Sequence, residues 1–390
     1  METKGDKGRY RFALWRDKCQ MYSKTFGLYL PLSPSISLYL PKSYLRKLSF
    51  LFTSKRITAI FLFLLFLPTI SLAQEASDTL RVMWYNVENL FDCEDNPEKN
   101  DEEFLPTGEN QWTHTRYWRK QRNLARVIAA VGDRRLPDLI GLCEVEGDSV
   151  LTDLTHRSPL RTAGYQYIVT HSPDERGIDV ALLYLTGRFR PLMHRCIPVR
   201  GGDRPTRDIL HVTGLVSPVD TIDLFLCHFP SRRGGERSSR PFRIKAAQVL
   251  RQAIDSVSAI RKEAKIIAMG DFNDALIDTP VGKAMDIEPL SEASRPFKHH
   301  LIPLNADKHP GTYAYQGRWE VIDHLLVNPS LLDSSASLHT KPTLARIANL
   351  PFLLTTDEKF GISIPLRTYI GPRYLGGFTD HLPVVVDFCQ

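Results

Sequence analysis

Cysteine is scarce in this chain, with six among 390 residues. None of the spacings matches the paired cysteine and histidine patterns of a zinc site. Cys143 and Cys227 lie inside apolar runs, and we expect most of the cysteines to be small buried side chains. Five cysteines follow residue 73, an odd number, so one disulfide is compatible with an oxidising compartment but the sequence assigns none.

Several signatures of well-known enzyme classes are also missing. The sequence contains no P-loop, no dinucleotide-binding fingerprint and no active-site serine motif. These absences argue against P-loop nucleotide hydrolases, nicotinamide-dependent oxidoreductases and serine hydrolases. Internal repeats and low-complexity tracts are absent as well, so we expect no repeat array.

The net positive charge is confined to the N-terminal part. The full chain has a formal charge of +6, with 50 Lys and Arg against 44 Asp and Glu. Residues 1–73 contain 12 of the basic and 3 of the acidic residues, which leaves −3 for residues 74–390. Global charge is therefore no argument for nucleic-acid binding, and only local basic patches can be.

The N-terminal leader has the parts of a secretory signal. Lys55 and Arg56 precede an apolar run at residues 57–67, and Pro68 ends this run. Ser-Leu-Ala at residues 71–73 supplies the small side chains that a signal peptidase recognises. A run of 11 residues is too short to span a bilayer comfortably, which favours a cleaved signal over a membrane anchor.

We therefore divide the chain into a leader at residues 1–73, with the signal peptide at about residues 44–73, and a domain at residues 74–390. The mature protein would be exported, to a periplasm or out of the cell. The alternative is an uncleaved N-terminal membrane anchor. Residues 1–43 are too long for the basic segment that opens an ordinary signal.

The stretch AKIIAMGDFND at residues 264–274 links sequence pattern to chemistry most clearly. Residues 265–269 form the short apolar run of a buried strand, and Gly270 interrupts it. Asp271 and Asn273 follow two residues apart, so both would point to one side of an extended chain. The alternative is an Asx turn at the end of the strand, where Asp and Asn are frequent.

Similar runs occur along the rest of the chain and interleave with helical patterns. The expected strands are residues 80–86, 138–144, 165–170, 178–185, 209–216, 221–229, 265–269, 321–327 and 382–388. Apolar side chains recur at helical spacing in residues 115–131 and about 240–261. This interleaving predicts one α/β or α+β domain.

Polar side chains gather at the ends of these apolar runs. They are Asn86, Glu88, Glu144, His228, Asp271, Asn273, Asp323, Asp380 and His381. Carboxylates and amides dominate this set, and no thiolate pair occurs in it. Such oxygen ligands suit a hard cation, Mg²⁺, Mn²⁺ or Ca²⁺, better than zinc. The two histidines supply groups for acid–base chemistry.

Six short motifs occur in order along essentially the whole mature chain. They are YNVEN at 85–89, LCE at 142–144, CHFPS at 227–231, GDFND at 270–274, IDHLLV at 322–327 and TDH at 379–381. In this order the chain resembles the endonuclease/exonuclease/phosphatase superfamily, which includes deoxyribonucleases, apurinic endonucleases, sphingomyelinases and inositol-polyphosphate phosphatases. The resemblance implies a four-layer sandwich, in which two mixed β-sheets pack face to face and helices cover the outside.

The resemblance also implies a metal site. Glu144 would be the principal metal ligand, and Asn86 would help to hold the site. Glu88 stands where some members of the superfamily have a second acidic group. Asp380 would be a further carboxylate on the side of the metal.

Catalytic roles carry over by position in the same way. Asp271 and Asn273 would orient or activate the attacking water and contact the scissile phosphate. His381 would be the general base or a phosphate contact, and Asp323 would fix its tautomer and orientation. His228 would donate a hydrogen bond to a non-bridging phosphate oxygen.

The densest basic segment of the mature chain is SRRGGERSSRPFR at residues 231–243. It directly follows the strand that ends at His228, a placement that favours phosphate binding. Arg207, Arg232 and Arg233 are the candidate phosphate clamps. The alternative is that these arginines simply face water.

Two other segments have no assigned chemistry. The acid-rich residues 92–103 are predicted to form a solvated surface loop, because no EF-hand spacing supports a calcium site there. Residues 328–378 are long for one connection in a compact domain, and such loops are often lids or binding insertions.

Three functions are compatible with these patterns. The first is a divalent-metal-dependent endonuclease that hydrolyses phosphodiester bonds of DNA or RNA. The second is a phosphodiesterase or phosphatase of small or lipid phosphate esters on the same scaffold. The third is a binding module without catalytic activity, which the intact set of ligands and bases makes improbable. Nothing in the sequence implies a protein partner, so we expect a monomer.

The leader generates a direct prediction. N-terminal sequencing of the exported protein should give a mature start near Gln74, because cleavage is expected after Ala73. A mature start before residue 50 would contradict the assignment of the signal peptide.

Overall fold

The computed structural model describes residues 79–200, 205–216, 220–261, 263–289, 300–305 and 310–390. The predicted leader lies outside the described residues, and with it the signal-peptide and anchor interpretations. Within the described part of the chain, no helix is both long and apolar enough to cross a membrane.

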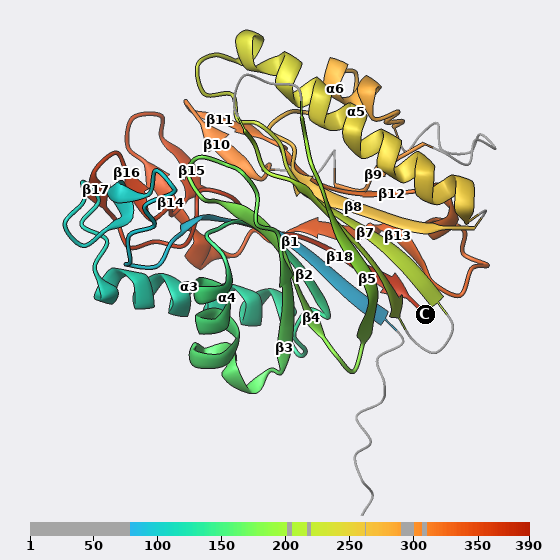
Figure 1. Ribbon diagram of the computed structural model, residues 1–390, viewed down its shortest axis with the longest axis horizontal. Helices are drawn as coiled ribbons and strands as arrows, with labels where there is room; N and C mark the ends of the chain where they lie inside the picture. The colour runs from blue at the N-terminus through green and yellow to red at the C-terminus, as the bar shows by residue number, and fades with distance from the viewer. Residues whose placement is uncertain (1–78, 201–204, 217–219, 262, 290–299, 306–309) are drawn as a thin grey trace, which may run out of the picture. The chain divides into compact units, whose positions relative to one another are not determined.

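Two six-stranded mixed sheets form the centre of the fold (Figure 1). The first sheet has the order β13-β18-β1-β2-β4-β3, with bounds β1 Thr79–Leu90, β2 Leu139–Val145, β3 Tyr165–Val169, β4 Asp179–Leu185, β13 His339–Ile347 and β18 Val384–Cys389. The second has the order β5-β6-β7-β8-β12-β9, with bounds β5 Phe189–Ile197, β6 Ile209–Val216, β7 Asp220–His228, β8 Lys265–Asp271, β9 Ile302–Pro303 and β12 Asp323–Val327.

Each sheet contains one parallel pair connected through a long helix. β1 and β2 pair in parallel, and α3 (His114–Gly132) lies between them in the sequence. β7 and β8 pair in parallel, and α5 (Glu236–Ile260) connects them. All other pairings in the two sheets are antiparallel. The fold therefore uses the same β-α-β unit once in each sheet.

Three apolar clusters show how the layers pack. One joins the first sheet to α3, one lies between the sheets, and one joins the second sheet to α5. Alternate residues of β1 divide between them, because Met83 contacts the α3 side while Val82 and Trp84 face the other sheet. Figure 1 shows α3 and α5 on opposite outer faces. The predicted four-layer sandwich of two mixed sheets flanked by helices is confirmed.

The predicted strands and helices match elements of the structure, with one local difference. Gly270 does not interrupt its strand, because β8 continues through it to Asp271. A side chain at this position would lie 2.6 Å from the backbone oxygen of Cys227. Gly270 is therefore required by the close approach of β7 and β8, and the interpretation as a strand break was wrong.

The expectation of one long connection over residues 328–378 was also wrong. Residues 339–347 form β13, the edge strand of the first sheet, and its pairing with β18 shifts between Thr340 and Ala345. A proline is tolerated in an edge strand with a bulge, and Pro342 stands there. The edge strand β5 was not predicted either, because most of its side chains are exposed and it lacks an apolar alternation.

Shorter elements complete the described chain. The remaining helices are η1 Glu102–Phe104, α4 Asp148–Thr152, η2 Asp153–Arg157, η3 Pro159–Thr162, α6 Pro280–Ala284, η5 Pro329–Leu331 and η6 Pro351–Leu353. Three hairpins are built from β10 Tyr313–Tyr315 with β11 Arg318–Glu320, β14 Leu354–Asp357 with β15 Ile362–Pro365, and β16 Tyr369–Ile370 with β17 Arg373–Tyr374.

The five cysteines after the leader are all free thiols. Cys93, Cys143 and Cys227 are buried, as expected for small apolar fillers, whereas Cys196 is exposed. Burial raises the pKa of the Cys143 and Cys227 thiols, which keeps them protonated and unreactive.

His324 on β12 makes stability depend on pH. Its imidazole is buried, and Nε2 bonds to the backbone oxygen of Asp274 at 3.2 Å. Burial lowers the pKa of His324 from 6.5 to about 4. Between these two values the unfolded chain binds more protons than the folded chain, so stability is complete above pH 6.5 and falls as the pH falls towards 4.

We expect the free energy of unfolding to decrease by about 2 kcal/mol from pH 7.5 to pH 5 through this residue. Replacing His324 by Phe should flatten the acid side of a plot of unfolding free energy against pH, measured by urea denaturation. His194→Phe, at an exposed position on β5, is the matched control and should leave the profile unchanged. Equal acid sensitivity of wild type and His324→Phe would contradict the assignment.

Candidate active site

The carboxyl ends of the two parallel strand pairs carry four of the predicted site residues. In the first sheet Asn86 lies in β1 and Glu144 near the end of β2. In the second sheet His228 ends β7 and Asp271 ends β8, and the two are paired in register. Functional groups are common at such carboxyl edges, because parallel strands deliver successive loops to the same place.

Asn86 joins carboxylates from both sheets. Its Nδ2 donates to Glu144 Oε1 at 3.2 Å and to Asp271 Oδ2 at 3.1 Å. His228 Nε2 lies 3.8 Å from the same Glu144 oxygen and 3.7 Å from the same Asp271 oxygen. An amide, two carboxylates and an imidazole therefore converge on one point between the sheets.

Glu144 reaches this point because the end of β2 leaves the regular strand conformation. Its φ is 62°, and the pairing of β2 with β4 is irregular between Cys143 and Val145. A left-handed residue in such a bulge takes its side chain out of the regular alternation. The backbone N–H of Asn89 then donates to Glu144 Oε2 at 2.9 Å and holds the carboxylate in place.

A positive φ also contradicts the expectation that Asn273 and Glu88 continue extended strands. Asn273 has φ 51° and Glu88 has φ 50°, so neither continues an extended chain. The N–H of Asn273 donates to Asp271 Oδ1 at 2.9 Å, which is the Asx turn rather than the same-side arrangement. Asn273 Nδ2 donates to the backbone oxygen of Phe229 at 3.1 Å, so its amide braces the loop after β7.

Glu88, predicted at the metal site, lies in a different network. Its Oε1 accepts from Arg367 Nε at 3.2 Å, and its Oε2 accepts from the Thr368 N–H at 2.7 Å. The buried Lys120 Nζ lies 3.5 Å from the second oxygen. Burial and the charge of Asp380 raise the pKa of Glu88. The positive φ and these partners direct the carboxylate away from the cluster around Asn86.

Arg367 connects that network to the cluster. Its Nη2 donates to Asp380 Oδ2 at 2.7 Å, and Asp380 Oδ1 lies 3.9 Å from His381 Nε2. Burial by itself would raise the pKa of Asp380, but Arg367 and His381 outweigh it and lower the pKa. Sequence reasoning missed Arg367, because it falls within residues 328–378, where no motif marks it.

His381 is oriented by the carboxylate that was predicted to orient it. His381 Nδ1 and Asp323 Oδ2 are 2.6 Å apart, and the other Asp323 oxygen accepts from Trp84 Nε1 at 3.0 Å. His381 Nε2 consequently faces Asp271 Oδ2 at 3.9 Å. Burial alone lowers the pKa of His381, but Asp323, Asp380 and Asp271 raise it well above the ordinary value.

Asp271 and His228 end neighbouring strands of the second sheet, but a negative charge lies near Asp271 and a positive charge lies near His228. Burial and the neighbouring charge of Asp323 raise the pKa of Asp271 to about 7. Burial and the charge of Arg207 lower the pKa of His228 well below its ordinary value. His228 is therefore a neutral imidazole, and its buried Nδ1 has no hydrogen-bond partner within the described part of the protein.

Arg207, predicted as a phosphate clamp, is buried and already paired. Its Nη1 lies 3.1 Å from Asp174 Oδ2, and its Nη2 donates to the backbone oxygen of Phe229 at 2.7 Å. The guanidinium braces the loop that follows His228. Arg207 is close enough to influence the site electrostatically, but these bonds leave it little freedom to bind a phosphate.

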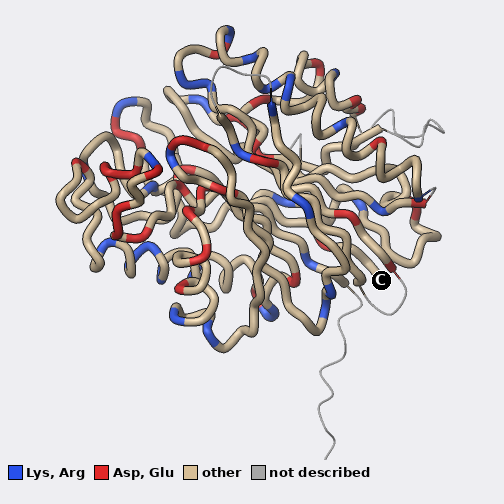
Figure 2. The backbone as a smooth tube through the Cα atoms, viewed as in Figure 1, with Lys and Arg blue, Asp and Glu red and all other residues tan. Residues whose placement is uncertain are grey.

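The arginine-rich segment is largely neutralised by its own neighbours. Arg232 donates to the backbone oxygen of Asn273 at 2.8 Å and pairs with Glu320. Arg243 is fully buried and pairs with Asp274. Arg233 is exposed and makes no ion pair within the described residues. Figure 2 shows the basic positions of this segment near the start of α5.

The donor set fits a hard divalent cation. Asp271, Asp323 and His381 offer ligand atoms within 4.8 Å of one another, the one such group in the described part of the chain. Asp323 is bonded to Trp84 and His381, whereas Asp271 and Glu144 meet at the Asn86 amide, so these two carboxylates are the pair best placed to share a cation. A cation between two neighbouring carboxylates removes their repulsion, and oxygen ligands of this kind suit Mg²⁺, Mn²⁺ or Ca²⁺.

Solved structures of known proteins have folds similar to that of this chain. The fold is similar to that of a humanized D. rerio TDP2 (TM-score 0.50, 15% identity, 80% of this chain and 100% of that chain). It is similar also to TDP2 of Caenorhabditis elegans (TM-score 0.50, 17% identity, 80% and 98% coverage). A mannosyl-6-phosphatase of Bacteroides thetaiotaomicron matches with a TM-score of 0.49 and 17% identity over 80% of this chain and 100% of that one.

These identities are low enough that the structures show the fold alone. No curated protein matches the sequence significantly. The sequence model described as "Endonuclease/Exonuclease/phosphatase family" matches residues 81–390, which include both sheets and every residue of the cluster. The chain therefore belongs to the endonuclease/exonuclease/phosphatase family.

Proposed function

We propose that this protein is a divalent-metal-dependent hydrolase of phosphoesters, acting on phosphodiester bonds. The convergence of Glu144 and Asp271 on the amide of Asn86, beside an oriented His381, carries the proposal. When bound, the cation would neutralise charge that grows on the phosphate oxygens as the bond breaks. The residues that would hold it are Glu144 and Asp271, with Asp380 nearby.

The protein's own groups supply the rest of the chemistry. Asp323 holds Nδ1 of His381, so that Nε2 faces the cluster. Because the surrounding carboxylates raise the pKa of His381 well above its ordinary value, the ring is protonated at neutral pH, and Nε2 can donate a hydrogen bond or a proton to a phosphate oxygen. Burial and the charge of Asp323 raise the pKa of Asp271 to about 7, and a bound cation would keep this carboxylate ionised. His228 is in position to donate a hydrogen bond to an oxygen beside Glu144.

The choice of substrate depends on the charge around the site. Nucleic acid is supported by two exposed arginines, Arg233 in the loop after β7 and Arg237 in the first turn of α5. Small or lipid phosphate esters are supported by the pairing of Arg207 and Arg232 with Asp174 and Glu320, which removes two of the expected phosphate clamps. We favour the small or lipid esters for this reason, and nucleic acid is the alternative.

We further propose that the enzyme is exported as a monomer. The basic, apolar and small-residue segments between residues 44 and 73 support export. The proposal needs no protein partner, because all groups of the cluster come from one chain.

Activity should depend on the cation and on His381. The full chain should hydrolyse bis-p-nitrophenyl phosphate in the presence of Mg²⁺ or Mn²⁺, and EDTA should abolish the reaction. His381→Ala should lower kcat by about 10²–10⁴, the usual contribution of a positioned acid or base. A parallel plasmid-nicking assay distinguishes nuclease activity from hydrolysis of small esters.

The matched control is His194→Ala, which removes an exposed imidazole on β5 and should leave kcat unchanged. Hydrolysis that survives EDTA, or an undiminished rate for His381→Ala, would refute the proposed mechanism. Nicking without hydrolysis of small esters would select the nuclease.

The role of Asp323 can be measured without substrate. Asp323→Asn removes the negative charge that raises the pKa of His381, so this pKa should fall. Nuclear magnetic resonance of labelled histidine rings, followed against pH, measures the change. Activity should fall by about 10- to 100-fold, as is usual when the orienting partner of a functional imidazole is lost.

Asp220→Asn is the control, because Asp220 pairs with Lys265 and is not part of the cluster. An unchanged pKa of His381 in Asp323→Asn would show that the carboxylate does not govern the imidazole.

A further inference from the structure

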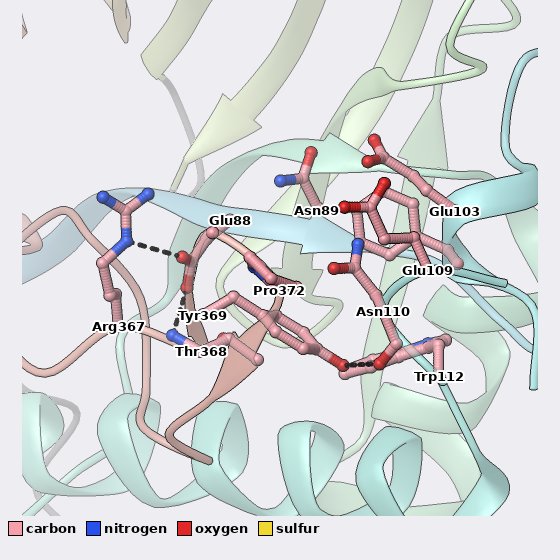
Figure 3. Close-up of a pocket in the computed structure, with 12 residues that line it drawn as sticks. Glu88, Asn89, Glu103, Glu109, Asn110, Trp112, Arg367, Thr368, Tyr369 and Pro372 are labelled. Atoms are coloured by element: carbon pink, nitrogen blue, oxygen red, sulfur yellow. Dashed lines mark hydrogen bonds and ion pairs between the residues drawn. The ribbon is translucent and has the colours of Figure 1, made fainter.

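A pocket of about 270 Å³ lies beside the candidate active site (Figure 3). Its walls come from the end of β1, from η1 and the segment that connects it to α3, and from the segment around β16. Its size is near the lower end of ligand pockets in proteins, so it would admit a compact substituent rather than a polymer.

The pocket is connected directly to the cluster around Asn86. Asn89 lines the pocket, and its backbone N–H donates to Glu144 Oε2 at 2.9 Å. Arg367 lines it too, and its Nη2 donates to Asp380. A phosphoester held at Glu144 could therefore extend its organic substituent into this pocket.

The charged side chains of the pocket that have no ion-pair partner among the described residues are negative. Glu103 and Glu109 both line it, both are exposed, and neither has an ion-pair partner in the described part of the protein. The guanidinium of Arg367 is already shared between Glu88 and Asp380. In Figure 3, Glu103 and Glu109 lie towards one end and Arg367 with Glu88 at the other. A second phosphate would be repelled here, and a positive group attracted.

Aromatic and amide groups form the rest of the lining. Tyr369 and Trp112 both line the pocket, and their ring centroids are 6.0 Å apart. Asn110 is 9% exposed, and its backbone oxygen accepts from the Tyr369 hydroxyl at 2.9 Å. Its side-chain amide lines the pocket without a hydrogen-bond partner among the described residues, so a ligand can use its oxygen as an acceptor.

The carboxylates of the pocket are not arranged to chelate a metal ion. In the described part of the chain, the one group spaced for an ion is the one at Asp271, outside the pocket. Exposed carboxylates in a pocket that also has aromatic side chains in its lining suit a larger, diffuse cation, which gains from both charge attraction and cation–π contact.

We propose that this pocket is the substrate-specificity subsite and binds a compact organic ammonium group carried by the phosphoester. The proposal rests on the proposed hydrolysis at Glu144 and names the class of substrate. Glu103 and Glu109 attract the ammonium, the rings of Tyr369 and Trp112 pack against its carbons, and the Asn110 amide accepts one of its hydrogen bonds when the nitrogen carries any.

The test compares three p-nitrophenyl phosphodiesters that share a leaving group and differ in the second arm: 2-aminoethyl, n-propyl and 2-carboxyethyl. The full chain should give a kcat/KM about tenfold higher for the aminoethyl ester than for its neutral propyl isostere, which corresponds to one added charge contact. The carboxyethyl ester should be the poorest substrate.

The double variant Glu103→Gln/Glu109→Gln should remove the preference for the aminoethyl ester over the propyl ester. The matched control is Glu98→Gln/Glu102→Gln, which removes two exposed carboxylates from the same region outside the pocket lining and should keep the preference. Equal kcat/KM for the aminoethyl and propyl esters, or a preference retained by Glu103→Gln/Glu109→Gln, would overturn the proposal.

Calorimetry separates this inference from the hydrolytic function. O-phosphoethanolamine should bind the wild type more tightly than propyl phosphate, and the double variant should bind the two equally. If no ester is hydrolysed but this difference in binding is found, the proposed hydrolysis fails and the subsite stands. If the esters are hydrolysed at equal rates and the two ligands bind equally, the hydrolysis stands and the subsite fails.

Discussion

One amide holds the candidate active site together. The Asn86 side chain donates to Glu144 in its own sheet and to Asp271 in the facing sheet, so its two hydrogen bonds set the distance between the carboxylates. Burial and the charge of Asp323 raise the pKa of Asp271, and the charge of Glu144 adds to this effect, so these carboxylates are held together at a cost. The sandwich can maintain such a pair because both residues lie on rigid, buried strands.

The charged side chains around this cluster are paired with one another. Glu88, Arg367 and Asp380 form a chain of ion pairs that runs from the end of β1 to the residue before His381, and Lys120 from α3 approaches it. A buried charge needs partners, and each member here has at least one. The network therefore positions one wall of the site and one wall of the neighbouring pocket together.

Much of the fold follows from local sequence pattern. Short apolar runs that end in polar side chains predicted the central strands, and apolar periodicity predicted α3 and α5. Asn86, Glu144, His228 and Asp271 could be placed at strand ends, because carboxyl ends of neighbouring parallel strands share an edge. The exposed or proline-containing edge strands β5 and β13 could not be predicted, because they lack a clear apolar alternation.

The sequence by itself determined the central strands, the helices α3 and α5 and the kinds of side chain at the strand ends, since these depend on apolar periodicity over short distances. Only the tertiary structure decided which carboxylates face one another. Glu88 and Glu144 both leave regular strands with positive φ, yet Glu88 meets Arg367, 279 residues away, and Glu144 meets Asn86. Partners so distant along the chain are brought together by packing of the sheets and loops, which no local pattern encodes.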